Sequence, residues 1–287
     1  MKYKLQLLTC LFLFALLTSY CQPGKNPSIK GKLFIIGGGD RSPKLMKTLL
    51  TTAQLKKDDY VIILPMSSEE PDTSFYYIRQ DFEQVCSNTL ANLNFTKEKI
   101  NDKTWLDSLR KARLIFITGG DQNRFMNIVL HTPIQEAIFE AFRNGATIAG
   151  TSAGAAIMSK KMITGNEFSG DSVRSGSFKK IQYHLVEIKE GLGLIDNAII
   201  DQHFIARSRY NRLLSVLAQF PSYPCIGIDE ATAIIVSGKQ ITVAGESQVI
   251  TFSISQPVKI SPVTGSLVKM RDVHLNILTA GDVFMLK

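Results

Sequence analysis

Three short apolar runs in this chain lead directly into glycine-bearing turns, and this repeated pattern constrains the fold more than any other feature. The turns are Gly37-Gly38-Gly39-Asp40, Gly119-Gly120-Asp121-Gln122 and Gly150-Thr151-Ser152-Ala153-Gly154. In doubly wound sheets, ligands bind outside the carboxyl ends of the strands, where glycine lets the backbone approach the ligand closely. The pattern therefore predicts a parallel sheet with three site-forming loops along one edge.

The apolar runs alternate with segments of helical periodicity from residue 32 to residue 250, which is typical of crossover units on a parallel sheet. Continuous apolar runs of this kind fit strands that are covered on both faces. The predicted strands are Leu33–Ile36, Tyr60–Leu64, Leu114–Thr118, Ala146–Ala149, Ala198–Ile200 and Ile226–Ile228. Apolar stripes after Pro133 and from Tyr210 to Ala218 predict two helices that pack on the sheet.

Beyond Ala231 the pattern changes to short β-branched runs separated by the turn Ser237-Gly238-Lys239, which predicts antiparallel hairpins. No linker separates this tail as a domain of its own. The predicted fold class is therefore α/β, with a doubly wound, mostly parallel sheet flanked by helices and with antiparallel hairpins at the C-terminus.

The composition excludes several classes of protein. With 287 residues, 45% of them hydrophobic, the chain can bury a substantial core and is not disordered. The formal net charge is +8, but the basic residues form no long run, so a nucleic-acid partner is not expected. The dinucleotide pattern G-x-G-x-x-G fails at Ser42, no P-loop is present, and the four histidines lack metal-ligand spacing. The sequence therefore predicts neither a cofactor nor a metal.

The N-terminal segment has the pattern of an export signal. Lys2 and Lys4 precede the apolar run from Leu5 to Leu17, which is too short to span a bilayer. The following Leu17-Thr18-Ser19-Tyr20-Cys21 resembles a bacterial lipoprotein box, although Tyr20 is larger than the residue usual before the cysteine. Residues 1–21 are thus a predicted signal, with lipidation of Cys21 and simple cleavage both open.

On this interpretation, residues 22–31 are a polar tether, residues 32–287 are one domain, and the mature protein is periplasmic, extracellular or lipid-anchored at a bacterial cell envelope. An exported protein can hold a disulfide between Cys86 and Cys225, and two buried free thiols are the alternative. The sequence does not decide whether the protein forms a homodimer.

The turn around Ser152 has the pattern of a nucleophile elbow. It follows a predicted strand, contains only small residues, and runs into the helix-forming Ala155-Ala156-Ile157-Met158. Such a turn lifts the serine hydroxyl clear of the sheet and directs the next backbone N–H, that of Ala153, at the attacked carbonyl oxygen. A glycine-rich turn with a helix-capping serine is the alternative.

A catalytic serine needs a base, and His203 is the best-placed histidine because it directly follows the strand Ala198–Ile200. His184, in the polar stretch before Gly191, is the weaker candidate. The carboxylate that orients the base is predicted at Asp229 or Glu230, which follow the strand Ile226–Ile228.

The resulting order of serine, histidine and acid differs from the order in α/β-hydrolases, where the acid precedes the histidine. Either the fold is a different one, or the acid is one of Asp171, Asp196 and Asp201.

Five ordered blocks of this sequence resemble the cyanophycinases, which belong to a group of serine peptidases that also contains peptidase E. The blocks are the three glycine turns given above, Asp201-Gln202-His203-Phe204 with its following arginines, and Gly227-Ile228-Asp229-Glu230-Ala231-Thr232-Ala233. The resemblance extends over most of the chain and implies a fold similar to class I glutamine amidotransferase domains. It also implies a triad of Ser152, His203 and Glu230.

The same resemblance implies an oxyanion hole formed by the backbone amides of Gly120 and Ala153, and a substrate pocket formed by Gln122, Asp201, Gln202, Arg207, Arg209 and Arg212. Helical spacing would place Arg209 and Arg212 together opposite the apolar stripe, where guanidinium groups suit bidentate capture of a carboxylate. The segment from Lys160 to Gly191 looks longer and more polar than the family pattern and is expected to rim the site.

The function expected from these features is that of an exported serine exopeptidase acting on β-aspartyl-arginine units of cyanophycin. Three alternatives remain open: a broader isoaspartyl or aspartyl dipeptidase of the same fold, an esterase, and a lipid-anchored binding protein without catalysis.

Overall fold

The computed structural model describes residues 31–169, 172–255 and 263–286. The predicted signal, Cys21, residues 22–30 of the predicted tether and Asp171 lie outside these ranges. Within the described ranges, no helix has both the length and the apolar character needed to cross a membrane.

The central sheet has eight strands in the order β15-β12-β11-β1-β5-β4-β2-β3. Five of them run parallel to one another: β1 (Lys32–Ile36), β5 (Thr147–Thr151), β4 (Leu114–Ile117), β2 (Tyr60–Leu64) and β3 (Thr89–Asn92). The other three extend the sheet in antiparallel fashion: β11 (Thr232–Ser237), β12 (Gln240–Gly245) and β15 (Val283–Met285). The predicted α/β class with a mostly parallel sheet is confirmed.

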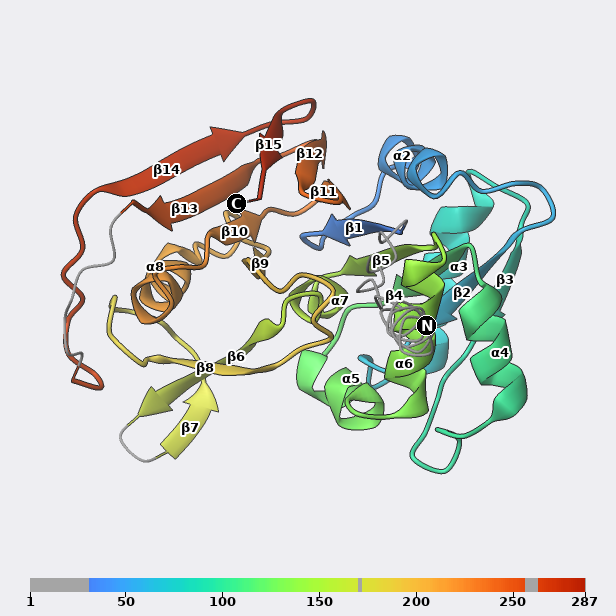
Figure 1. Cartoon of the computed structure of the whole chain (residues 1–287), viewed down its shortest axis with the longest axis horizontal. Coiled ribbons are helices and arrows are strands. Elements are labelled where there is room, and N and C mark those ends of the chain that lie inside the picture. The colour runs from blue at the N-terminus through green and yellow to red at the C-terminus, as the bar shows by residue number, and fades with distance from the viewer. Residues whose placement is uncertain (1–30, 170–171, 256–262, 287) are drawn as a thin grey trace, which may run out of the picture.

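Helices cover both faces of the parallel strands (Figure 1). The side chains of Phe34 and Ile36 on β1 pack in a core with α2 (Pro43–Ala53) and α3 (Pro71–Glu83). Those of Leu33 and Ile35 belong to the core on the other face, with α4 (Lys103–Lys111), α5 (Gln122–Val129) and α6 (Pro133–Arg143). Since successive strand residues point to opposite faces, this two-sided burial explains why the strands are apolar throughout.

Two predicted strands lie in a separate sheet, which corrects the expectation of one continuous parallel sheet. β9 (Ile199–Gln202) and β10 (Cys225–Ile228) pair in parallel, and the crossover helix α8 (Tyr210–Gln219) connects them, as their spacing predicts. They form a four-stranded sheet with β13 (Val249–Ile254) and β14 (Val273–Leu278), in the order β14-β13-β10-β9. Local periodicity specifies the crossover unit, whereas the choice of sheet depends on the antiparallel partner β13, far along the chain.

The predicted tail hairpin is confirmed for β11 and β12, which are joined at Gly238 and Lys239. The next strand, β13, pairs with β14 rather than with β12. The segment from Lys160 to Gly191 forms a three-stranded antiparallel sheet of β6 (Lys161–Ser169), β7 (Ser172–Ser175) and β8 (Val186–Glu190), which extends from the body of the molecule (Figure 1).

Candidate active site

Ser152 occupies a sharp turn between β5 and the short helix α7 (Ala153–Ala156). Its backbone has φ 53° and ψ −110°, a conformation that costs a non-glycine residue about 1–3 kcal/mol. A Cβ atom on Gly150 would lie only 2.3 Å from the carbonyl oxygen of Gly154, so the turn leaves no room for a side chain at position 150. The local geometry is that of the predicted elbow.

Tertiary structure brings the three proposed triad residues into one hydrogen-bonded chain. His203 Nε2 lies 2.8 Å from Ser152 Oγ, and His203 Nδ1 lies 2.5 Å from Glu230 Oε1. The imidazole is buried, with 7% of the residue exposed. Ser152 follows β5 of the central sheet, whereas His203 and Glu230 follow β9 and β10 of the four-stranded sheet, so the site lies where the two sheets meet.

The triglycine turn after β1 fits tightly against the imidazole. A Cβ atom on Gly38 would lie 2.3 Å from His203 Cε1, and Gly38 itself has φ 109°. The amide of His203 donates to the carbonyl of Gly37 at 2.7 Å. The turn therefore supports the histidine, and no phosphate-binding role is needed to explain its glycines.

The pKa of His203 is lowered from its ordinary value. Burial is the main cause, and the positive charge of Arg207 acts in the same direction, while the hydrogen bond that His203 donates to Glu230 opposes them. The imidazole is therefore neutral at neutral pH and is able to accept the hydroxyl proton of Ser152.

The other acid candidates lie elsewhere. Asp229 turns away from His203 and accepts hydrogen bonds from the amides of Ile205 and Ala206. Asp196 lines a separate cavity. Asp201 is paired with Arg212. Of the described acid candidates, Glu230 is the one whose carboxylate contacts the imidazole.

His184, the weaker candidate base, lines a different surface hollow, together with Lys179, Lys180 and Gly265. His203, not His184, hydrogen-bonds Ser152.

The turn that contains Gly120 lies beside the serine. A Cβ atom on the preceding Gly119 would be 3.3 Å from Ser152 Cβ. The amide of Asp121 donates to the carbonyl of Ser67 at 2.8 Å, which holds this turn against the loop after β2. Ala153 directly follows Ser152, and Gly120 directly follows Gly119, whose built Cβ would lie 3.8 Å from Ser152 Oγ, so both proposed oxyanion-hole residues are next in sequence to residues at the hydroxyl.

Gln122 connects the site to the three-stranded sheet. Its Nε2 donates to the carbonyls of Ile163 at 3.0 Å and Thr164 at 2.6 Å, and the side chain is buried. The segment from Lys160 to Gly191 therefore contacts Gln122, one of the predicted pocket residues. The contact lies where the register between β6 and β8 shifts, between Ile163 and Glu167.

Asp201 and Arg212 form a buried ion pair, with 1% and 3% of each residue exposed. Arg212 Nε lies 2.9 Å from Asp201 Oδ2, and Nη2 contacts Oδ1. The expectation that Arg212 projects with Arg209 from the exposed side of the helix is wrong, because Asp201 on β9 holds it in the interior. Neither charge of this pair is free for substrate.

Arg207 and Arg209 differ from Arg212 in exposure. Arg207 is exposed, and its amide donates to the carbonyl of His203. Arg209 Nη1 donates to the backbone carbonyl of Gln202 at 2.7 Å and to its Oε1 at 2.8 Å. Burial and the neighbouring charge of Arg212 lower the pKa of Arg209 to about 10, so it remains a cation at neutral pH. These two arginines are the cations beside the triad.

Sequence reasoning missed Arg41, which donates to the carbonyl of Gly39 at 3.0 Å and pairs with Asp81 of α3 at 2.7 Å. It connects the triglycine turn to α3. The only local signal is its position directly after the turn. Cys86 and Cys225 are both free thiols, so the disulfide alternative does not hold in this structure.

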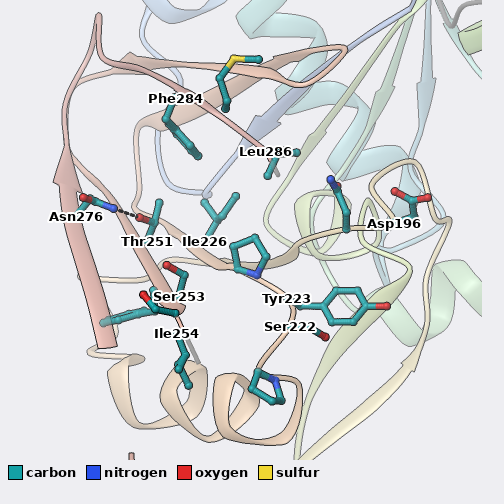
Figure 2. Close-up of a pocket in the computed structure, with 16 residues that line it drawn as sticks. Asp196, Ser222, Tyr223, Ile226, Thr251, Ser253, Ile254, Asn276, Phe284 and Leu286 are labelled. Carbon is teal, nitrogen blue, oxygen red and sulfur yellow. Dashed lines mark hydrogen bonds between the residues drawn. The ribbon is translucent and has the colours of Figure 1, made fainter. Parts of the chain in front are cut away.

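A cavity of about 650 Å³ is lined by Asp196, Tyr223 and Ile226 among other residues, none of them a triad member (Figure 2). Asp196 precedes β9, and Tyr223 and Ile226 lie before and within β10, so this cavity is at the amino ends of strands whose carboxyl ends lead to His203 and Glu230. The described residues contain no group of three His, Cys, Asp or Glu side chains that is arranged to hold a metal ion.

Comparisons with known proteins place this geometry in a family. The model of peptidase family S51 matches residues 33–244. A cyanophycinase from Trichormus variabilis is 33% identical over 270 residues, covering 90% of this chain and 86% of the relative. A cyanophycinase from Geminocystis herdmanii is 36% identical over 196 residues, covering 67% of this chain and 68% of the relative.

Solved structures agree on the fold. A peptidase from an acI-B1 actinobacterium superposes with a TM-score of 0.64 at 22% identity, covering 90% of this chain and 98% of that one. A candidate peptidase E from Listeria monocytogenes superposes with a TM-score of 0.51 at 18% identity, covering 76% and 99%. At these identities the likeness concerns the fold alone.

Proposed function

Because this chain belongs to peptidase family S51 and is a serine-type peptidase, we propose that Ser152 is its nucleophile, His203 its general base and Glu230 the carboxylate that orients the base. The observation that carries this proposal is the hydrogen-bonded chain from Ser152 Oγ through both ring nitrogens of His203 to Glu230. It has the arrangement in which a serine is activated by a histidine held in one tautomer.

In the proposed reaction, Ser152 Oγ attacks the scissile carbonyl carbon while His203 Nε2 takes the hydroxyl proton. The amides of Gly120 and Ala153 donate to the oxygen that becomes negatively charged. His203 then gives its proton to the leaving amine, which departs as the acyl-enzyme forms. A water molecule attacks this ester by the reverse sequence, and Ser152 recovers its proton from His203.

We further propose that the substrate is cyanophycin or a related β-aspartyl peptide, cleaved from an end to give β-aspartyl-arginine. Cyanophycin has a poly-aspartate backbone with arginine on each side-chain carboxyl. Relatives that align with 90% of this chain are cyanophycinases, which supports the assignment. The cations of Arg207 and Arg209 beside the triad suit capture of a substrate carboxylate.

Product analysis tests this substrate. Purified protein is incubated with cyanophycin, with a β-aspartyl peptide lacking arginine, and with an α-linked control, and the products are identified by mass. Release of β-aspartyl-arginine from cyanophycin alone is the expected result. Comparable cleavage of the arginine-free peptide would favour the broader isoaspartyl peptidase, and cleavage of simple esters alone would favour an esterase.

We also propose that the protein is exported, from the charged and apolar pattern of its first 21 residues. Intact-mass analysis of protein from its native host tests this. A mass that begins at Met1 would contradict export, whereas a diacylglyceryl mass on Cys21 would identify a lipoprotein.

A further inference from the structure

Asp229 is a buried carboxylate that the proposed mechanism does not use. It is 6% exposed, and it directly precedes Glu230 in the sequence. Its Oδ1 accepts from the amide of Ile205 at 3.0 Å and from that of Ala206 at 2.9 Å. Its Oδ2 accepts from Ser247 Oγ at 2.6 Å. One side chain thus joins the turn after His203 to the loop after β12.

Both amides belong to the turn that presents His203. This histidine has φ 47°, a left-handed conformation that persists only where surrounding contacts enforce it. Its own amide is held by Gly37, and the amide of the next residue, Phe204, is held by Ile228. The hydrogen bonds to Asp229 fix the two residues that follow, so four consecutive amides of the turn have partners.

The carboxylate of Asp229 is suited to this role because it stays ionised. Burial acts to raise its pKa, but the hydrogen bonds from Ser247, Ala206 and Ile205 outweigh burial, and the pKa is lowered overall. A charged acceptor forms stronger hydrogen bonds to backbone amides than a neutral one.

We propose that Asp229 is a positioning residue, which holds the amides of Ile205 and Ala206 so that the backbone of His203 keeps Nε2 within reach of Ser152 Oγ. This inference rests on the proposed roles of Ser152 and His203. It assigns different tasks to two neighbouring acids: Glu230 orients the imidazole ring, and Asp229 fixes the backbone that carries the ring.

The test is the rate at which a small fluorophosphonate labels Ser152, which depends on His203 without requiring the substrate-binding arginines. Asp229→Ala should lower this rate and kcat by about 10- to 100-fold, since small misplacements of catalytic groups have effects of this size. Asp229→Asn should stay within about threefold of wild type, because its carboxamide oxygen still accepts both amides.

A second readout is the low-field resonance of the proton that His203 Nδ1 donates to Glu230. It should be lost or broadened in Asp229→Ala and retained in Asp229→Asn. Asp102→Ala is the control for loss of stability without loss of positioning. Asp102 accepts a hydrogen bond from the amide of Trp105 and caps α4, a helix that carries no triad residue. This control should lower Tm and leave the labelling rate unchanged.

A labelling rate in Asp229→Ala within twofold of wild type, measured well below its Tm, would overturn the inference. If Asp229→Ala does not fold, Ser247→Ala decides: it should slow labelling about threefold, and an unchanged rate would refute the positioning role. Failure of the proposed function looks different, because wild-type protein would then not be labelled, or would be labelled at a residue other than Ser152.

Discussion

Arg212 Nε lies 2.9 Å from Asp201 Oδ2, and neither side chain is appreciably exposed. This pair connects α8 to β9 directly before His203, so it holds the crossover helix against the strand that leads to the proposed base. It therefore belongs to the support of the site rather than to its substrate-binding surface.

Arg212→Met should destabilise the protein by about 3–5 kcal/mol, because it removes the nearer cation of the buried Asp201 carboxylate and leaves it only Arg209, whose Nη1 lies 3.7 Å from Oδ1. The measurement is the free energy of unfolding in urea. Arg207→Gln, at an exposed position, is the control and should change this free energy by no more than about 0.5 kcal/mol. Adding Asp201→Asn to Arg212→Met should recover part of the loss; if Arg212→Met alone is as stable as wild type, the supporting role is refuted.

The two neighbouring acids should respond differently to removal of charge. Glu230→Gln should lower kcat by roughly 10² to 10⁴, because an amide stabilises the imidazolium poorly and permits the wrong tautomer. Asp229→Asn should have a small effect by comparison. Steady-state kinetics on both variants measure this difference, and equal losses would move the third triad role away from Glu230.

The pH dependence follows from the lowered pKa of His203. The base must be neutral, so kcat/KM should fall as the pH drops through a pKa below the ordinary histidine value of about 6.5. Arg207→Gln removes a nearby positive charge that favours the neutral form, so the acidic limb should move to higher pH. Glu230→Gln should move it to lower pH. Profiles of kcat/KM against pH for the wild type, Arg207→Gln and Glu230→Gln measure both shifts. A displacement of the acidic limb of Arg207→Gln to lower pH would contradict the assignment of this limb to His203.

Gly38→Ala should abolish labelling of Ser152 while the protein remains folded. The new Cβ atom would lie 2.3 Å from His203 Cε1, so the imidazole must move away from Ser152. Gly238→Ala is the matched control, because that glycine also has positive φ, at 59°, but has no atom within 4 Å of a built Cβ. Circular dichroism and the labelling rate are measured for both variants. Labelling of Gly38→Ala at the wild-type rate would mean that His203 is not the base.

The strands, the helices and the loops that carry the proposed catalytic residues can be located from local sequence patterns. Continuous apolar runs in the strands and a periodicity of 3.6 residues in the helices reflect local burial, so the alternation of strands and helices is encoded within windows of about ten residues. The small residues around Ser152 are required by the turn itself, which is why the elbow is visible without a structure. The same is true of the hairpin at Gly238, where a two-residue loop between Ser237 and Gln240 must reverse the chain.

Long-range contacts determine which sheet β9 and β10 join, and which carboxylate faces His203. Asp229 and Glu230 are adjacent acids after one strand, and their opposite orientations depend on partners from distant segments, among them Ser247 and Gly39. Arg212 likewise follows the helical spacing of Arg209 but is drawn inward by Asp201, because a buried carboxylate needs a cation. Long-range pairing of this kind leaves no periodic trace in the sequence, since it depends on which segments meet in space.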